Sequence, residues 1–213
     1  MHHHPTSTAT TPNTPREWTY QTHRYTTPCG HLDVTINDHH IVQSHYILHT
    51  WPTPHPTTHA PRQLTTSPAL SDSQQRLVDD IGRQLDNYFN GTTRTFDLPL
   101  CTDDDVSEFT HTVRQEMMRI PPGAVITYGD LAAAAGRPRA ARAVGTVCRT
   151  NPIQLFIPCH RVIASGGSLG GYMGDARGLS LKQQLLDNEG IPFTPHGKVD
   201  LRQLAYNPMT TLN

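Results

Sequence analysis

The segment LFIPCHRVI, residues 155–163, places a cysteine, a histidine and an arginine in succession as Cys159, His160 and Arg161. A cysteine between apolar runs is usually an inert, small hydrophobic side chain. Histidine and arginine neighbours, however, favour the thiolate, which is the nucleophilic form of cysteine. These three residues alone leave both interpretations of Cys159 open, so the surrounding elements have to distinguish between them.

Two short helices are predicted just before this segment, over residues 129–135 and 138–149, with Pro138 in the first turn of the second. The second helix has an apolar face made of Ala140, Val144, Val147 and Cys148, and a polar face made of Arg139, Arg142, Thr146 and Arg149, with Gly145 between them. Two short helices joined by a glycine turn are typical of a DNA-binding helix-turn-helix. An ordinary amphipathic helix with a solvated basic face is the alternative, and the pattern alone fits both.

The formal net charge is only −1, but arginines gather in one part of the chain. Residues 111–161 contain two acidic residues and seven arginines, namely Arg114, Arg119, Arg137, Arg139, Arg142, Arg149 and Arg161. A basic segment in a nearly neutral chain indicates a local anionic partner such as a phosphate backbone.

The first hundred residues predict a small α/β unit. Residues 18–49 alternate apolar and polar side chains between turn residues, which predicts two or three antiparallel strands. A helix is predicted over 73–90, with an inward face of Leu77, Ile81, Leu85 and Phe89. Residues 95–100, TFDLPL, form a further strand or an extended connector.

A helical part follows from residue 103. Asp103–Asp105 are predicted to cap a helix with an apolar stripe of Val106, Phe109, Val113, Met117 and Ile120. Pro152 and Pro158 favour extended backbone, so Cys159 is expected on a strand or an extended segment. A last helix is predicted within 179–190, with Leu181, Leu185 and Leu186 inward, and the chain after Gly190 is expected to be a polar tail.

Low-complexity segments account for part of the low mean hydropathy of −0.51. Residues 1–15 and 50–71 are rich in Thr, Pro and His and are expected to be a disordered tail and a flexible loop. We therefore expect an N-terminal domain over 16–100, a second domain over 103–192 and a tail over 193–213.

The four cysteines lie far apart and predict no disulfide framework, and the fourteen histidines show no metal-binding spacing, so no metal is expected. No secretory signal or membrane-spanning run is present, so a soluble protein of the cytoplasm, without a membrane partner, is expected.

One long pattern is more specific than any of these features. The string GAVITYGDLAAAAGRPRAARAVGTVCRTNP, followed by IPCHRVI, GGYMG and LLDNEG, resembles the O6-alkylguanine-DNA alkyltransferases over about residues 105–191. Residues 16–98 resemble that family weakly, through TPCGHL. The resemblance implies an α+β fold, in which a small RNase-H-like antiparallel sheet domain precedes a helical DNA-binding domain with a helix-turn-helix.

The same resemblance implies direct reversal of DNA damage. The family flips an O6-alkylated guanine out of the duplex, because the reacting atom is unreachable in the stack, and moves its alkyl group to a cysteine. The cysteine is not regenerated, so each molecule acts once. It implies double-stranded DNA bound through the minor groove, no cofactor, repair of O4-alkylthymine as well, and a monomer that could bind DNA cooperatively.

The roles carry over by position. Cys159 would accept the alkyl group, His160 would take its proton through a water, and Glu189 would orient His160. Tyr128 would support the flipped nucleotide and donate a proton, and Asn151 would be the hinge before the active-site segment.

Further positions concern DNA and the alkylated base. Arg142 would insert into the base stack, and the remaining expected DNA contacts are Arg139, Ala141, Gly145, Thr146 and Arg149. The base pocket would be formed by Pro158, Val162, Tyr172 and Met173. Met173 stands where many relatives have a small polar residue, and the loop that follows is about three residues longer than in compact relatives.

Two rival functions remain. A lesion-binding protein of the alkyltransferase-like class lacks the acceptor cysteine, whereas Cys159 is present here. A cysteine hydrolase using Cys159, His160 and Glu189 would leave the arginine-lined helix unexplained.

Overall fold

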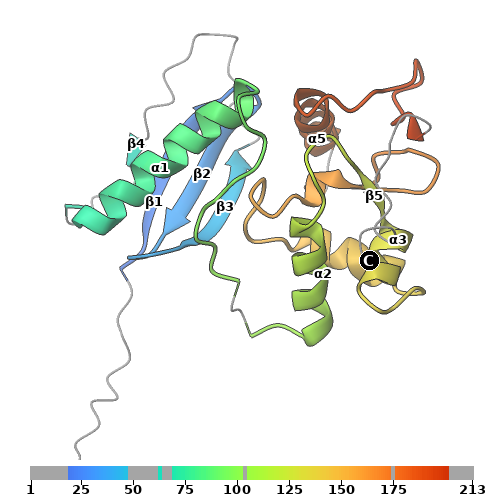
Figure 1. Ribbon diagram of the computed structural model, residues 1–213, viewed down its shortest axis with the longest axis horizontal. Helices are drawn as coiled ribbons and strands as arrows, with labels where there is room; N and C mark the ends of the chain where they lie inside the picture. Colours follow the sequence, from blue (N-terminus) through green and yellow to red (C-terminus); the bar gives the residue numbers. More distant parts are fainter. Residues whose placement is uncertain (1–18, 48–61, 64–68, 103–104, 174–175, 202–213) are drawn as a thin grey trace, which may run out of the picture.

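The computed structural model describes residues 19–47, 62–63, 69–102, 105–173 and 176–201 (Figure 1). The expected tail over 1–15, most of the expected loop over 50–71 and the end of the chain after residue 201 lie outside these residues. A four-stranded sheet covered by one long helix lies beside a group of shorter helices (Figure 1).

The predicted antiparallel strands are confirmed. Strands β1 (Gln21–Thr27), β2 (Gly30–Ile36) and β3 (Ile41–Ile47) form a meander, and the short β4 (Arg62–Gln63), inside the segment expected to be a loop, pairs with β1. The order is β3-β2-β1-β4, with every neighbour antiparallel. Inward residues of the sheet such as Tyr25, Leu32 and Val34 are fully buried, as the alternating pattern requires.

Helix α1 (Asp72–Phe89) covers one face of the sheet. Ser71 and Gln74 form a capping box at its start, which satisfies two of the free main-chain N–H groups there. Leu77, Ile81 and Leu85 face inward as predicted. The hydroxyl of Tyr25 in β1 donates to the main-chain oxygen of Val78 at 3.0 Å and joins the sheet to the helix.

The free edge of β3 is covered by two other segments of the chain. Residues 95–100 form an extended connector, and Ile41 pairs with it through Pro99 and Cys101. Residues 152–154 add main-chain bonds to Ser44 at 2.9 and 3.1 Å. An exposed edge strand invites pairing with other chains, and these bonds close it. They also join the sheet to the helical part, and one hydrophobic core runs through both.

The helical part contains α2 (Glu108–Met118), α3 (Tyr128–Ala134), α4 (Ala141–Arg149) and α5 (Ala176–Asn188). Two short parallel strands, β5 (Ile126–Thr127) and β6 (Val162–Ile163), lie between them. The predicted caps differ in detail. Ser107 caps α2, in place of the acidic run at 103–105, and Pro138 lies in the turn before α4, outside the helix.

The expected strand at Cys159 is wrong. Residues Cys159–Arg161 form a single turn of 3-10 helix, η1, which begins after Pro158. The fixed φ of proline suits the start of a helical turn. A strand would send alternate side chains to opposite faces, whereas this turn spaces three successive side chains about a third of a turn apart. Cys159, His160 and Arg161 can therefore all be buried, each against a different element.

The expected polar tail after Gly190 is also wrong for the residues described. Ile191 and Val199 are buried with Leu186, and Phe193 pairs with Val199. A short hairpin thus covers the end of α5. Among the described residues, no helix has the length and apolar character needed to cross a bilayer. The division into two domains near residue 103 stays a prediction.

The packing of α1 predicts the effect of one core substitution. Leu85 is fully buried between α1 and the core, so Leu85→Ala should lower the free energy of unfolding by about 2–5 kcal/mol. Urea unfolding followed by circular dichroism measures this. Arg83→Ala on the exposed side of the same helix is the control and should change stability by less than about 0.5 kcal/mol. Equal effects of the two variants would contradict the described packing.

Candidate active site

The Cys159 side chain lies at the start of η1 and is only 3% exposed. Its sulfur accepts a hydrogen bond from Asn151 Nδ2 at 3.1 Å. The same amide donates to the main-chain oxygen of Ile157 at 2.8 Å, and its oxygen accepts from the N–H of Ile153 at 3.2 Å. Asn151 follows the end of α4, so one side chain fixes the path from that helix to the thiol.

The charge state of Cys159 depends on opposing influences. Burial raises the pKa of the thiol, and the hydrogen bond from Asn151 and the positive charge of Lys182 lower it, with burial dominant. The thiol therefore needs a nearby group that takes its proton before it becomes a strong nucleophile.

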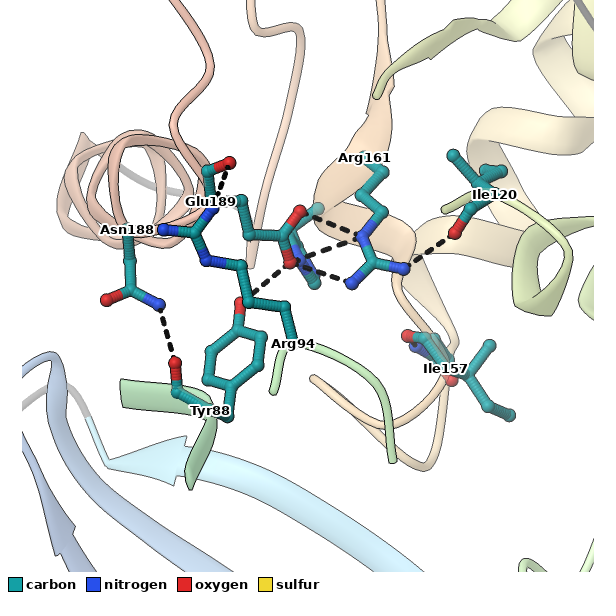
Figure 2. Close-up of polar contacts among 9 residues, drawn as sticks. Tyr88, Arg94, Ile120, Ile157, Arg161, Asn188 and Glu189 are labelled. Atoms are coloured by element: carbon teal, nitrogen blue, oxygen red, sulfur yellow. Dashed lines mark hydrogen bonds and ion pairs between the residues drawn. The ribbon is translucent and has the colours of Figure 1, made fainter. Parts of the chain in front are cut away.

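Glu189 is the centre of a buried network of polar groups (Figure 2). Its Oε1 lies 2.9 Å from His160 Nε2 and 2.8 Å from Arg161 Nη2, and its Oε2 accepts from Arg161 Nε at 2.9 Å. Tyr88, from the end of α1, donates its hydroxyl to the same Oε1 at 2.7 Å. Arg161 also donates to the main-chain oxygen of Ile120 at 2.7 Å.

These contacts settle the protonation states. Burial alone would raise the pKa of Glu189, but His160 and Arg161 hold that pKa well below its usual range, so the carboxylate is ionised. Burial lowers the pKa of His160, against the influence of Glu189, so the imidazole is neutral near pH 7. A carboxylate only accepts hydrogen bonds, so His160 carries its proton on Nε2. Its Nδ1 is buried and has no hydrogen-bond partner among the described residues.

The end of α5 sets the position of Glu189. Gly190 has φ +80°, a conformation that suits glycine after a helix. The N–H of Ile191 bonds back to the oxygen of Leu186 at 3.0 Å, and the two side chains pack together. This is the hydrogen-bonded ending in which a helix stops abruptly, and it leaves Glu189 at a fixed place.

A cavity of about 250 Å³ borders the thiol. Its lining combines α3, α4, the segment from α4 to η1 and the glycine-rich loop: Tyr128, Gly145, Cys148, Arg149, Gln154, Cys159, Gly171, Tyr172 and Met173. A side chain at Gly170 would lie about 3.0 Å from the ring of Tyr128, so glycine lets the loop approach that ring. Burial raises the pKa of Tyr128 to about 12, so its hydroxyl remains a proton donor at neutral pH.

Lys182 lies beneath this cavity and is fully buried. Its ammonium group donates to the main-chain oxygens of Val162 at 2.5 Å and Leu169 at 2.6 Å. It also lies 5.9 Å from the ring centres of Tyr128 and Tyr172. Burial lowers the pKa of Lys182 to about 8, although the thiols of Cys159 and Cys148 raise it. The lysine is therefore mainly charged at pH 7 and stabilises negative charge on Cys159.

The basic face of α4 is open to solvent. Arg142, Thr146 and Arg149 are exposed on the helix, Arg139 is exposed just before it, and Ala141 and Gly145 are partly exposed. Arg114 and Arg161, which were counted in the basic segment, are buried instead. The exposed positive surface is thus narrower than the sequence indicates, and it borders the cavity through Arg149 and Gly145.

Most of the expected site residues come together. Cys159 contacts Asn151, His160 contacts Glu189, and Tyr128, Tyr172 and Met173 line one cavity with the thiol. Pro158 and Val162 do not. Pro158 lines a different cavity, of about 510 Å³, on the side of the connector, and the Val162 side chain is in the core.

Four residues with a place in the site were missed or assigned elsewhere. Cys148 packs against the core, as the inward face of its helix predicts, and it also lines the cavity, which the pattern does not indicate. Arg161 was counted as a surface charge, whereas it neutralises Glu189. Nothing in the local sequence of Tyr88 or Lys182 distinguishes them from helix residues that only pack, because their partners are distant in the chain. Among the described residues, no three His, Cys, Asp or Glu side chains are grouped to hold a metal ion.

Known proteins resemble this chain over the residues that form this site. Residues 108–191 match the family described as 6-O-methylguanine DNA methyltransferase, DNA binding domain. The methylated-DNA–protein-cysteine methyltransferase of Methanosarcina acetivorans is 42% identical over 116 residues, which cover 54% of this chain and 71% of the relative. The constitutive enzyme of that name from Bacillus subtilis is 34% identical over 167 residues, or 78% of this chain and 93% of the relative.

Solved structures extend the likeness to the N-terminal sheet. The O6-methylguanine methyltransferase of Mycobacterium tuberculosis matches with a TM-score of 0.61 and 28% identity, covering 80% of this chain and 93% of that one. The structure of Mycobacterium tuberculosis OGT in complex with DNA matches with a TM-score of 0.60 and 29% identity, covering 80% and 91%. From its sequence and its fold, this chain belongs to the family of methylated-DNA–protein-cysteine methyltransferases.

Proposed function

We propose that the protein repairs DNA by moving the alkyl group of O6-alkylguanine to its own Cys159, once per molecule. The observation that carries this proposal is the cavity that borders the Cys159 thiol and opens beside the exposed arginines of α4. A base flipped out of a duplex held on α4 would enter this cavity and meet the sulfur. The family to which the chain belongs supports the same chemistry.

The transfer is a displacement at the alkyl carbon. The Cys159 thiol gives its proton, through a water, to Nδ1 of His160, whose Nε2 proton faces the Glu189 carboxylate. The thiolate then forms a sulfur–carbon bond while the bond from that carbon to O6 breaks, and the electron pair stays on the guanine. Tyr128 supplies a proton as the guanine leaves. The product is a stable thioether, and no step of this mechanism removes the alkyl group from the sulfur, so the protein is not regenerated.

The charges around the site suit this sequence of steps. Glu189 is ionised and stabilises the imidazolium that forms, as an orienting carboxylate does in other relays. Lys182 stabilises the thiolate before transfer. Tyr172 and Met173 would bound the flipped base, and Asn151 would hold the sulfur in line.

The DNA would lie across α4, with α3 and α4 acting as a helix-turn-helix. Exposed Arg139 and Arg149 would neutralise phosphates, and Arg142 would fill the gap left by the flipped base. Small residues at Ala141 and Gly145 let a backbone come close, which suits the minor groove. Repair of O4-alkylthymine, a monomeric state, cooperativity on DNA and a cytoplasmic location stay predictions.

A direct test of transfer uses duplex DNA that contains O6-methylguanine. After mixing, intact-protein and peptide mass spectrometry should show one added methyl group per molecule, on the peptide with Cys159, and none in Cys159→Ala. Cys148→Ser is the matched control, because this second thiol lines the same cavity and should not be needed. Lesion binding without a methyl gain would favour a damage sensor, and repeated ester hydrolysis would favour a hydrolase.

If Glu189 acts in this proton relay, Glu189→Gln should strongly reduce the rate of alkyl transfer, because it keeps the shape of the side chain and removes its charge. Loss of the proton-accepting relay should slow transfer by about 10²- to 10⁴-fold. Because the pKa of Glu189 is depressed, its charge persists throughout neutral pH and is lost only under acid conditions, so the wild-type rate should show no titration of Glu189 near pH 7. Rapid-mixing kinetics test this, with Glu116→Gln at a more exposed ion pair as control.

If DNA lies across α4, loss of one exposed arginine there should change how duplex affinity depends on salt concentration. Arg139→Ala should weaken duplex binding and reduce the slope of log affinity against log salt by about 1, the value for one lost phosphate contact. Fluorescence anisotropy at several salt concentrations measures the slope. Arg83→Ala, an exposed arginine on α1, should leave it unchanged. Equal slopes for all three proteins would mean that DNA does not lie across this face.

A further inference from the structure

Segments about a hundred residues apart meet at Asn188 and Glu189 through three hydrogen bonds (Figure 2). The Tyr88 hydroxyl donates to Glu189 Oε1 at 2.7 Å, and Arg94 Nη1 donates to the main-chain oxygen of Glu189 at 3.0 Å. The side-chain amide of Asn188 donates to the main-chain oxygen of Tyr88 at 3.3 Å. The sheet-bearing half of the chain thus holds both the backbone and the carboxylate of Glu189.

The two oxygens of the Glu189 carboxylate accept hydrogen bonds from different numbers of side chains. Oε1 accepts from Tyr88, His160 and Arg161, whereas Oε2 accepts from Arg161 alone among the described residues. A carboxylate oxygen has about two lone-pair sites, so three side chains share the charge of Oε1. The hydroxyl bond of Tyr88 therefore competes directly with the bond to His160.

We propose that Tyr88 is a positioning residue for the Cys159 reaction: its hydroxyl fixes the Glu189 carboxylate and withdraws part of the charge that Glu189 offers to His160. The tyrosine touches neither the sulfur nor the cavity that borders it. It acts through Glu189 and then through His160. The inference rests on the proposed function, in which His160 takes the proton of Cys159.

Among the described residues, four side chains from different elements face Glu189: Tyr88 from α1, Arg94 from the segment just before the connector, and His160 and Arg161 from η1. His160 also feels Arg161 and Lys182, which both disfavour its protonated form. Burial and the adjacent carboxylate keep the pKa of Tyr88 well above its usual value, so the hydroxyl stays a neutral donor.

Removal of the Tyr88 hydroxyl has a defined electrostatic sign. Tyr88→Phe returns charge to Oε1, and this charge stabilises protonated His160. The pair of thiolate and imidazolium is then more populated at neutral pH, and His160 takes up a proton from solvent at higher pH. The rate of Cys159 alkylation near pH 7 should therefore rise about tenfold, the scale of one hydrogen bond to a charged group, and the acid limb of its pH–rate profile should move to higher pH.

The readout is alkylation of full-length protein by iodoacetamide, followed on the Cys159 peptide by mass spectrometry between pH 5 and 10 or so. Tyr25→Phe is the matched control. Tyr25 is an equally buried tyrosine whose hydroxyl donates to Val78 in the same half of the chain, away from Glu189. This control should lose comparable stability and keep the wild-type profile.

A second variant should give a shift opposite to that of Tyr88→Phe, and it keeps the test valid if Tyr88→Phe folds poorly. Replacement of Tyr88 by 3-fluorotyrosine keeps the ring and the hydroxyl and makes the hydroxyl a stronger donor. It should lower the alkylation rate near pH 7 and move the acid limb to lower pH, opposite to Tyr88→Phe. An unmoved limb in both variants, shifts in the same direction, or an equal shift in Tyr25→Phe would overturn the proposal.

The test separates this inference from the function on which it rests. Iodoacetamide needs no DNA, so the profile reports the link from Tyr88 to Cys159 even if no methyl group passes from DNA to protein. Conversely, methyl transfer by the wild-type protein with unmoved profiles in the variants would keep the proposed repair activity and reject the role of Tyr88.

Discussion

A carboxylate that is almost completely removed from water can stay ionised only if other groups compensate its charge. Glu189 meets this requirement with one full positive charge from Arg161 and with donors from His160 and Tyr88. Removing one partner of such a buried pair typically costs about 3–5 kcal/mol, because the other charge is left uncompensated. The positions of η1, of the end of α5 and of the end of α1 are therefore linked through one side chain.

This constraint explains why the fold brings its two halves so close. The 3-10 turn presents His160 and Arg161 to Glu189, and the sharp ending of α5 at Gly190 delivers the carboxylate to them. Arg94, which directly precedes the connector along the edge of β3, donates to the main chain at the same place. Among the described residues, no strand of the four-stranded sheet donates a hydrogen bond to the Cys159 sulfur, yet the sheet carries the helix that supplies Tyr88. The buried contacts that join the two halves of the chain are thus the same contacts that position Glu189.

The sequence predicts those parts of the fold in which the pattern is local. The strands of the meander and the inward faces of α1 and α5 follow from apolar spacing, and they are found at the expected residues. Cys159 was misplaced on a strand because its flanking apolar runs mask a turn of only three residues. Arg161 was misread as a surface charge because no local signal distinguishes a buried arginine from an exposed one. Resemblance to a family supplied Glu189, whose distance from Cys159 in the chain hides any spacing pattern.

The separation of these partners along the chain also sets when the site can exist. His160 and Glu189 are 29 residues apart, and Tyr88 and Glu189 are 101 apart. A ribosome adds about 5–20 residues per second, so roughly 1.5 to 6 seconds pass between synthesis of Cys159 and synthesis of Glu189. During that interval the growing chain carries a cysteine without its relay. The relay is thus absent from every copy that stops before the end of α5, the last of the described helices.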